Sequence, residues 1–140
     1  MVRPEIMQAF DMGRAFEASP FGTKFSTSCL YPSAPPVYVH IGSWGYQFRV
    51  TDGGEAAICA LNHGRDNWAV EAGLHAAEKR YSLKLENAEL FAFANDAEWL
   101  PNVIAAVANG AAYAANVAID HALKSRQKTL SERITRALKN

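Results

Sequence analysis

The segment from Val37 to Gly54 constrains the fold most strongly, because apolar and polar residues alternate along it with a period of two. Such alternation is typical of strands that bury one face. With a loop at residues 42–45, the segment predicts a β-hairpin whose apolar side chains all share one face. The pairs expected across this hairpin are Ile41 with Tyr46, Val39 with Phe48, and Val37 with Val50.

The other face of the predicted hairpin is polar and carries Tyr38, His40, Gln47, Arg49 and Thr51. In this register Tyr38 lies opposite Arg49, an arrangement that suits cation–π stacking. A histidine beside arginine and threonine also suits acid–base chemistry. The sequence supplies no nucleophile or paired carboxylate with them, so we expect a solvated face, or one covered by the C-terminal tail or by a partner.

Trp44 lies at the tip of the predicted hairpin, where a large aromatic side chain is unusual. Two interpretations are equally open: the indole folds back on the core, or it anchors a partner at an exposed site. Trp44 is therefore a candidate binding residue, together with Tyr38, His40 and Arg49.

Two further segments predict strands. Residues 25–31 alternate, with Phe25 and Tyr31 among the inward positions, and they extend the hairpin to a short three-stranded antiparallel sheet. Residues 83–93 are consistent with a second hairpin around a polar turn at 86–89, with its register left open.

Helical spacing of apolar residues predicts three helices, over about residues 4–18, 54–61 and 67–81. A fourth and longest helix begins at Asn95 or Asp96. Its part from 104 to 118 consists mostly of Ala, Val and Gly, which lets neighbouring backbones approach closely, so we expect it to be the central packed helix. Together these elements define an α+β fold, with a small antiparallel sheet packed on three to four helices.

Asp52 precedes the helix expected at 54–61 and suits a cap at its start, while residues 62–64 carry a C-terminal stop signal. Ile58 and Leu61 are expected on the apolar side of that helix. The alternative for Asp52-Gly53-Gly54 is an anion site at the helix start. An acidic residue at the entrance repels an anion, so the turn and cap are favoured.

Asn102, Asn109 and Asn116 recur every seven residues along the longest predicted helix. One interpretation is a polar seam that fixes the pairing of this helix with another. The favoured interpretation is a solvent-facing stripe on a mostly buried helix.

Charge divides the chain into two parts. The 140 residues suit one domain, and 49% apolar with 20% charged residues is a globular composition. The net charge of zero argues against generalised nucleic-acid binding, but residues 1–123 hold 8 basic and 13 acidic side chains, and residues 124–140 hold 6 basic and 1 acidic. We therefore expect a single α+β domain over 1–123 and a basic amphipathic helical tail over 124–140.

The tail carries its own helix signals. Thr129 or Ser131 suits a cap, and a narrow apolar stripe follows, formed by Leu130, Ile134 and Leu138. Such a short helix is marginal alone, so it docks on something or stays mobile. The basic side chains around the stripe that are candidate binding residues are Arg126, Lys128, Arg133 and Arg136.

Metal, cofactor and membrane binding are not expected. The four potential zinc ligands, Cys29, His40, Cys59 and His63, have spacings that match no compact zinc motif. Polar residues interrupt the alanine-rich region 100–123, which disfavours a membrane span. The N-terminus shows no signal-peptide pattern. We therefore expect a cytoplasmic protein without metal or cofactor.

Several segments together resemble a bacterial domain family of unknown function, number 1828. They are residues 25–32, the hairpin ending at 50–53, the following helix with its glycine stop, and residues 83–93. The resemblance covers about residues 20–123, and departs from the family at Thr27-Ser28 and at 33–36, where we expect Thr-Pro and an Asp-Gly turn. It implies an α+β fold and a bacterial or phage origin, and carries no activity and no site residues.

These patterns favour a non-enzymatic binding or regulatory module that acts through protein–protein contacts, self-association included. The reasons are the absence of an assembled catalytic set, the amphipathic tail and Trp44. One alternative is nucleic-acid binding through the basic tail. Another is a small enzyme that uses the region of His40, Asp52 and His63.

Overall fold

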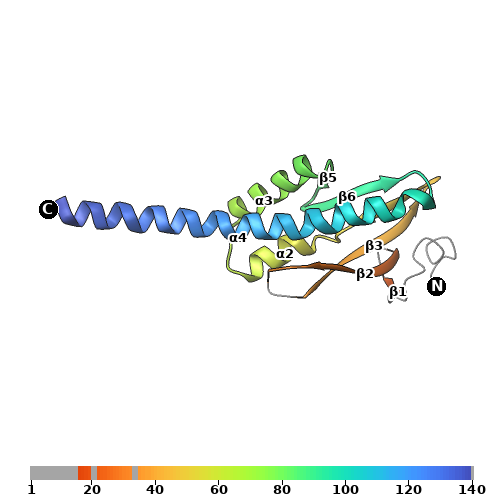
Figure 1. Ribbon diagram of the computed structural model, residues 1–140, viewed down its shortest axis with the longest axis horizontal. Coiled ribbons are helices and arrows are strands. Elements are labelled where there is room, and N and C mark those ends of the chain that lie inside the picture. Colours follow the sequence, from red (N-terminus) through yellow and green to blue (C-terminus); the bar gives the residue numbers. More distant parts are fainter. Residues whose placement is uncertain (1–15, 20–21, 33–34, 140) are drawn as a thin grey trace.

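The structure, a computed structural model, describes residues 16–19, 22–32 and 35–139 (Figure 1). Within them, six antiparallel strands form one sheet, and a 40-residue helix packs on one face of it. The α+β fold predicted from the sequence is confirmed.

Ten elements follow one another along the chain. They are β1 (Phe16–Ser19), β2 (Gly22–Leu30), β3 (Pro36–Trp44), β4 (Gln47–Thr51), α2 (Glu55–Asn62), α3 (Asn67–Arg80), β5 (Lys84–Glu86), β6 (Glu89–Ala94), the 3-10 turn η1 (Ala97–Trp99) and α4 (Leu100–Lys139).

The sheet is larger than the three strands expected. Its order is β1-β2-β3-β4-β6-β5, so the second hairpin joins the first through β6, with Thr51 opposite Phe91. The turn of that second hairpin is the pair Asn87 and Ala88, both with positive φ (52° and 62°), as in a type I′ turn. The polar turn predicted at 86–89 is therefore present, and the register left open is now defined.

The register predicted for the β3–β4 hairpin is wrong. Ile41 pairs with Val50 and Ser43 with Phe48, so the strands are longer and the loop is only Gly45 and Tyr46. Gly45 has a φ of 62°, which permits this tight turn. Tyr46, expected in the core, is fully exposed at 102%. The slip is an even number of residues, so the face that each strand buries is unchanged.

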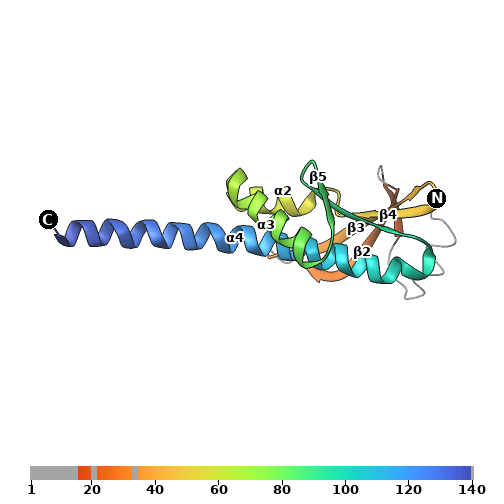
Figure 2. The same cartoon turned by 90° about the horizontal axis from the view of Figure 1, so that it is seen from above.

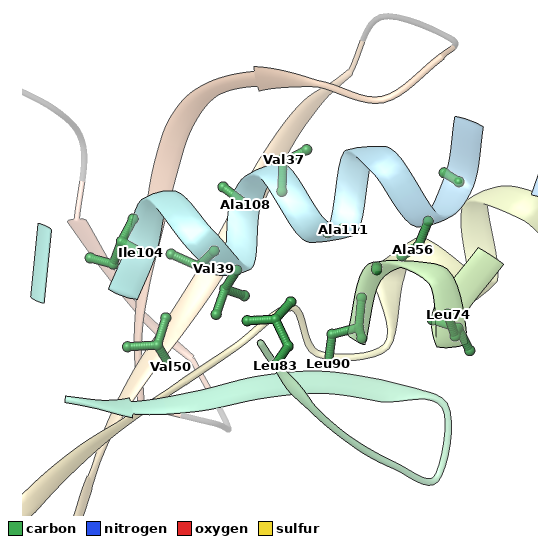
Figure 3. Close-up of a cluster of buried hydrophobic side chains, with 14 of the residues drawn as sticks. Val37, Val39, Val50, Ala56, Leu74, Leu83, Leu90, Ile104, Ala108 and Ala111 are labelled. Carbon is green, nitrogen blue, oxygen red and sulfur yellow. The ribbon is translucent and has the colours of Figure 1, made fainter. Parts of the chain in front are cut away.

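The core lies between the sheet and α4 (Figure 3). Val39 and Val50 come from the sheet, while Ile104, Ala108 and Ala111 come from α4, and all five are at most 4% exposed. The central packed helix predicted over 104–118 is therefore present, now as part of α4.

Small residues let α3 approach α4 closely. A side chain at Gly73 would collide with the backbone oxygen of Ala114, and one at Gly110 would collide with Leu83. Gly73 on α3 and Ala114 on α4 thus set the distance between the two helices, while Gly110 leaves room for Leu83, which follows α3.

Helix α2 buries a different side from the one expected. Its buried residues are Ala56, Ala57 and Ala60, whereas Ile58 and Leu61 are 53% and 48% exposed. The expectation for Ile58 and Leu61 is wrong, because α2 packs against α4 with small side chains at the contact.

The helix predicted over residues 4–18 falls mostly outside the described residues. Its last part, 16–18, belongs to strand β1, which pairs antiparallel with β2. For these residues the helical expectation is wrong.

The C-terminal half of α4 extends away from the body. From Leu100 to Lys139 the helix is continuous, so the new helix start expected at Thr129 or Ser131 is absent. In two perpendicular views, no other described element lies beside the last turns of this helix (Figures 1 and 2). The division into a domain over 1–123 and a tail over 124–140 stays a prediction.

One helical segment among the described residues, Ala97–Asp120, is long and apolar enough to cross a membrane by length and composition. In this structure the segment lies in the core, with Leu100, Ile104 and Val107 buried. The expected absence of a membrane span therefore stays a prediction, as does a cytoplasmic location.

Candidate functional site

The outer face of the sheet, opposite α4, carries a cluster built around Arg49. Its Nη1 lies 2.9 Å from Oε1 of Glu89, and its guanidinium lies 4.3 Å from the centroid of the Phe91 ring. The Thr51 hydroxyl donates a hydrogen bond to the same Glu89 oxygen. Strands β4 and β6 thus hold Arg49 in an ion pair and a cation–π contact at once.

The side chain of Trp44 belongs to this cluster and not to the core. Its ring centroid is 6.1 Å from that of Phe93 and 5.9 Å from the Arg49 guanidinium carbon, and the residue is 59% exposed. Of the two interpretations, folding back on the core is therefore wrong. The exposed indole remains available as an anchor for a partner.

A groove of about 480 Å³ lies over this part of the sheet. Its lining combines three aromatic rings with two basic and two acidic side chains, namely Trp44, Phe91, Phe93, Arg49, Lys84, Glu86 and Glu89, besides Asn87. Because Arg49 is already paired with Glu89, the groove presents no strong charge of one sign.

Tyr38 is not the partner of Arg49. The observed register places Gly42 opposite Arg49 and Ser26 opposite Tyr38. The expected Tyr38–Arg49 stack is therefore wrong, and the cation over the Tyr38 ring is the Lys24 ammonium, 4.2 Å from its centroid.

His40 is a buried residue of the same face, only 6% exposed, and its ring lies against Gly53. Burial lowers the pKa of His40 from its ordinary value, and the nearby Lys24 charge lowers it further. A neutral imidazole with so little exposure contacts its neighbours and offers little surface to a substrate.

Asp52 is completely buried and acts as a structural acceptor. One oxygen accepts hydrogen bonds from the N–H groups of Gly54 (2.9 Å) and Leu90 (3.0 Å), and the other accepts from Ala56 (3.2 Å). Burial raises the pKa of Asp52 to about 6 despite these bonds. The turn-and-cap interpretation therefore describes the contacts of Asp52, whose carboxylate is buried and already accepts the N–H groups at the start of α2.

The candidate enzyme residues do not form an open site. Asp52 and His40 are buried. His63 lies at the C-terminal end of α2, whereas Asp52 lies at its start, and the Nδ1 of His63 is 2.8 Å from the carbonyl oxygen of Cys59. His40, Asp52 and His63 were grouped as enzyme candidates only because they lie near one another in the sequence.

The four potential zinc ligands are divided between two places. Cys59 Sγ lies 3.9 Å from His63 Nδ1, whereas Cys29 donates toward the side-chain oxygen of Asn109. Among the described residues, no group of three or more His, Cys, Asp or Glu side chains is arranged to hold a metal ion.

The projecting end of α4 carries the exposed apolar stripe predicted for the tail. Leu130, Ile134 and Leu138 are 59%, 52% and 82% exposed, and Arg133 and Arg136 beside them are exposed as well. Arg126 and Lys128 belong to the same helix.

The stripe continues a line of exposed residues on the body half of α4. Asn116 and Ile134 are 18 positions apart, as are Asp120 and Leu138, and at about 3.6 residues per turn this spacing is about five full turns. Each pair therefore points in the same direction. The exposed line on the body contains Asn102, Ala105, Asn109, Asn116 and Asp120.

The three asparagines are thus solvent-facing in this single chain. Asn109 and Asn116 each donate from their amide nitrogen to the carbonyl oxygen four residues earlier, Ala105 and Ala112. These two bonds are local, the Asn109 side-chain oxygen also accepts a hydrogen bond from the Cys29 thiol, and all three asparagines remain exposed.

Comparison with known proteins gives no relative: no family model, no curated protein and no solved structure matches this chain. The resemblance to family 1828, and the bacterial or phage origin that it implies, therefore stay predictions.

Proposed function

We propose that this protein is a non-enzymatic binding or regulatory module that acts through protein–protein contacts, with a second copy of the chain as its partner. The observation that carries this proposal is the apolar stripe of Leu130, Ile134 and Leu138 on a helix end that extends from the body. This end continues α4 without a break, and the apolar side chains that it exposes favour a partner that covers them and thereby stabilises the helix.

The distribution of charge favours one surface of the second copy as the binding surface for the tail. Residues 124–140 carry 6 basic and 1 acidic side chains, so two tails packed against each other would place like charges together. The body over 1–123 has 13 acidic and 8 basic side chains and therefore attracts the tail. We expect the tail of each copy to lie on the body of the other.

The exposed line on α4 is the surface that suits this arrangement. Ala105 and the heptad-spaced Asn109 and Asn116 offer small and polar side chains to an approaching helix, and Asp120 supplies negative charge. An antiparallel α4 pair around a two-fold axis brings each stripe onto this line in the other copy. Asparagines within such a seam define its register.

Two neighbouring exposed residues provide a matched test. Ile134→Asp puts a charge in the stripe, while Thr135→Asp makes the same charge change about 100° around the helix. Light scattering should show a dimer for Thr135→Asp and a monomer for Ile134→Asp. Equal masses for the two variants would contradict the proposal.

Nucleic-acid binding is the second candidate, because the exposed Arg133 and Arg136 flank the stripe on the projecting helix. Phosphate contacts of this kind weaken steeply as salt rises. A gel shift titrated with salt tests it with the Arg133→Ala/Arg136→Ala variant. If the wild type is monomeric and this variant loses a salt-sensitive shift, nucleic-acid binding replaces the protein partner as the function.

A further inference from the structure

The groove over the Arg49 cluster offers a ligand side chains and little backbone. It lies on the outer face of the sheet, whereas α2, α3 and α4 all contribute residues to the core on the inner face. Strands β4 and β6 each have a paired neighbour on both edges, so their backbone groups are engaged in the sheet. The groove volume of about 480 Å³ is within the range of ligand sites in proteins.

Trp44 provides the accessible apolar surface of this groove. The residue is 59% exposed, and its ring is tilted by 49° against that of Phe93, with 6.1 Å between the centroids. Phe91, by contrast, is only 7% exposed, and the Arg49 guanidinium already lies over its ring. The exposed indole is therefore the ring on which a ligand can stack.

The polar groups of the groove include both donors and acceptors that solvent reaches. The ion pair joins Nη1 of Arg49 to Oε1 of Glu89, and these side chains are 22% and 23% exposed. Neither side chain has a buried polar atom without a partner, so the other Arg49 donors and the second Glu89 oxygen are accessible. Lys84 and Glu86 on β5 add an exposed ammonium and an exposed carboxylate.

This combination of groups favours a neutral ligand that is rich in hydroxyl groups. Arg49 and Lys84 repel a ligand with net positive charge, and Glu86 and Glu89 repel one with net negative charge. A hydroxyl both donates and accepts, so it pairs with either kind of side chain. A sugar ring combines such hydroxyls with an apolar face of C–H groups, which packs on a flat aromatic ring.

We propose that this groove binds a neutral oligosaccharide, with one sugar ring stacked on the Trp44 indole and its hydroxyl groups hydrogen-bonded to Arg49, Glu86 and Glu89. The site is independent of the proposed self-association, which uses α4 on the other face of the sheet. A chain that fails to dimerise can therefore still bind the saccharide, and the two proposals are tested separately.

The test is an NMR titration of the ¹⁵N-labelled full-length protein with cellotetraose, mannotetraose and chitotetraose, which are all neutral, and with the oligonucleotide decathymidylate. We expect at least one of the three oligosaccharides to shift the indole N–H signal of Trp44 and amide signals of β4 and β6. Because the ligand carries no net charge, its affinity should change less than about twofold between about 0.05 M and about 0.5 M salt.

Two pairs of variants test the roles of the side chains. Trp44→Ala should weaken binding about tenfold, because it removes the stacking ring, whereas Trp68→Ala, the same change at an exposed position of α3, should leave the affinity unchanged. Glu86→Ala should weaken binding about fivefold, because it removes a hydrogen-bond acceptor. Glu71→Ala, at an exposed position of α3, is its control.

Wild-type signals outside the groove show that each variant is folded. Absence of shifts with all three oligosaccharides would overturn the proposal, as would equal affinities of the wild type and Trp44→Ala. Binding of decathymidylate alone, with an affinity that falls steeply as salt rises, would overturn it in favour of a nucleic-acid site on the sheet.

Discussion

The carboxylate of Asp52 accepts a hydrogen bond from the backbone N–H of Leu90, 3.0 Å away, and so joins the end of β4 to strand β6. The same carboxylate accepts from the N–H groups of Gly54 and Ala56 at the start of α2. One buried side chain thus holds together three elements, at the point where the first hairpin leads into the helices.

Asp52→Ala should destabilise the protein strongly, because it leaves three backbone donors without their acceptor. Each such loss costs about 1–3 kcal/mol, so we expect a total of at least about 2 kcal/mol in the free energy of unfolding. Asp66→Ala is the control, since Asp66 accepts one bond, from Ala69, and is exposed. Urea denaturation that gives equal costs for the two variants would argue against this function of Asp52.

Asp52 also predicts a pH dependence. Burial raises its pKa from an ordinary value of 3.8 to about 6, so the folded state binds the proton more tightly than the unfolded state. Its contribution to stability is therefore complete below about pH 4 and is lost as the pH rises through about 6, by roughly 3 kcal/mol. His40 acts in the opposite direction, because its lowered pKa costs stability as the pH falls below 6.5.

Comparison with Asp52→Asn separates these two effects. As the pH rises from 4 to 6.5, the free energy of unfolding of the wild type should fall relative to that of this variant, in which position 52 cannot ionise. Urea midpoints measured across that range test the difference. Parallel curves for the two proteins would show that Asp52 does not titrate in this window.

Phe48→Ala should cost about 3–5 kcal/mol, because Phe48 is 9% exposed and packs in the core. Tyr46→Ala, two positions away, should change the stability by less than about 0.5 kcal/mol, since Tyr46 is fully exposed. The denaturation midpoints of the two variants therefore test the observed turn. In the register expected from the sequence both side chains are buried, so both substitutions would lower the free energy of unfolding strongly.

The hairpin shows what alternation can and cannot predict. A period of two assigns Val39 and Phe48 to the buried face in any register that slips by an even number of residues. It does not choose among those registers, and the choice depends on the tight turn at Gly45. Tyr46 continues the apolar pattern in sequence, although the chain has already left the strand there.

The Arg49 cluster could not be predicted from local sequence. Arg49 and Glu89 are 40 positions apart, and they meet only because β6 pairs with β4. Polar alternation placed Arg49 on the outer face, but the strand order supplied its partners.

The purified protein should hold no stoichiometric zinc, because Cys59 and His63 lie apart from Cys29 in the structure. Elemental analysis of protein purified without chelator tests this expectation. One zinc per chain that disappears in Cys59→Ser would contradict it and would favour the enzyme alternative.

Sedimentation equilibrium of the wild-type chain tests the central claim, that the projecting helix binds a second copy. At low salt we expect twice the chain mass of 15.3 kDa. Association should weaken as salt approaches about 1 M, where charge attraction is screened beyond about 3 Å, but burial of the apolar stripe is not screened. A mass of 15.3 kDa at every protein concentration and at low salt would contradict the account.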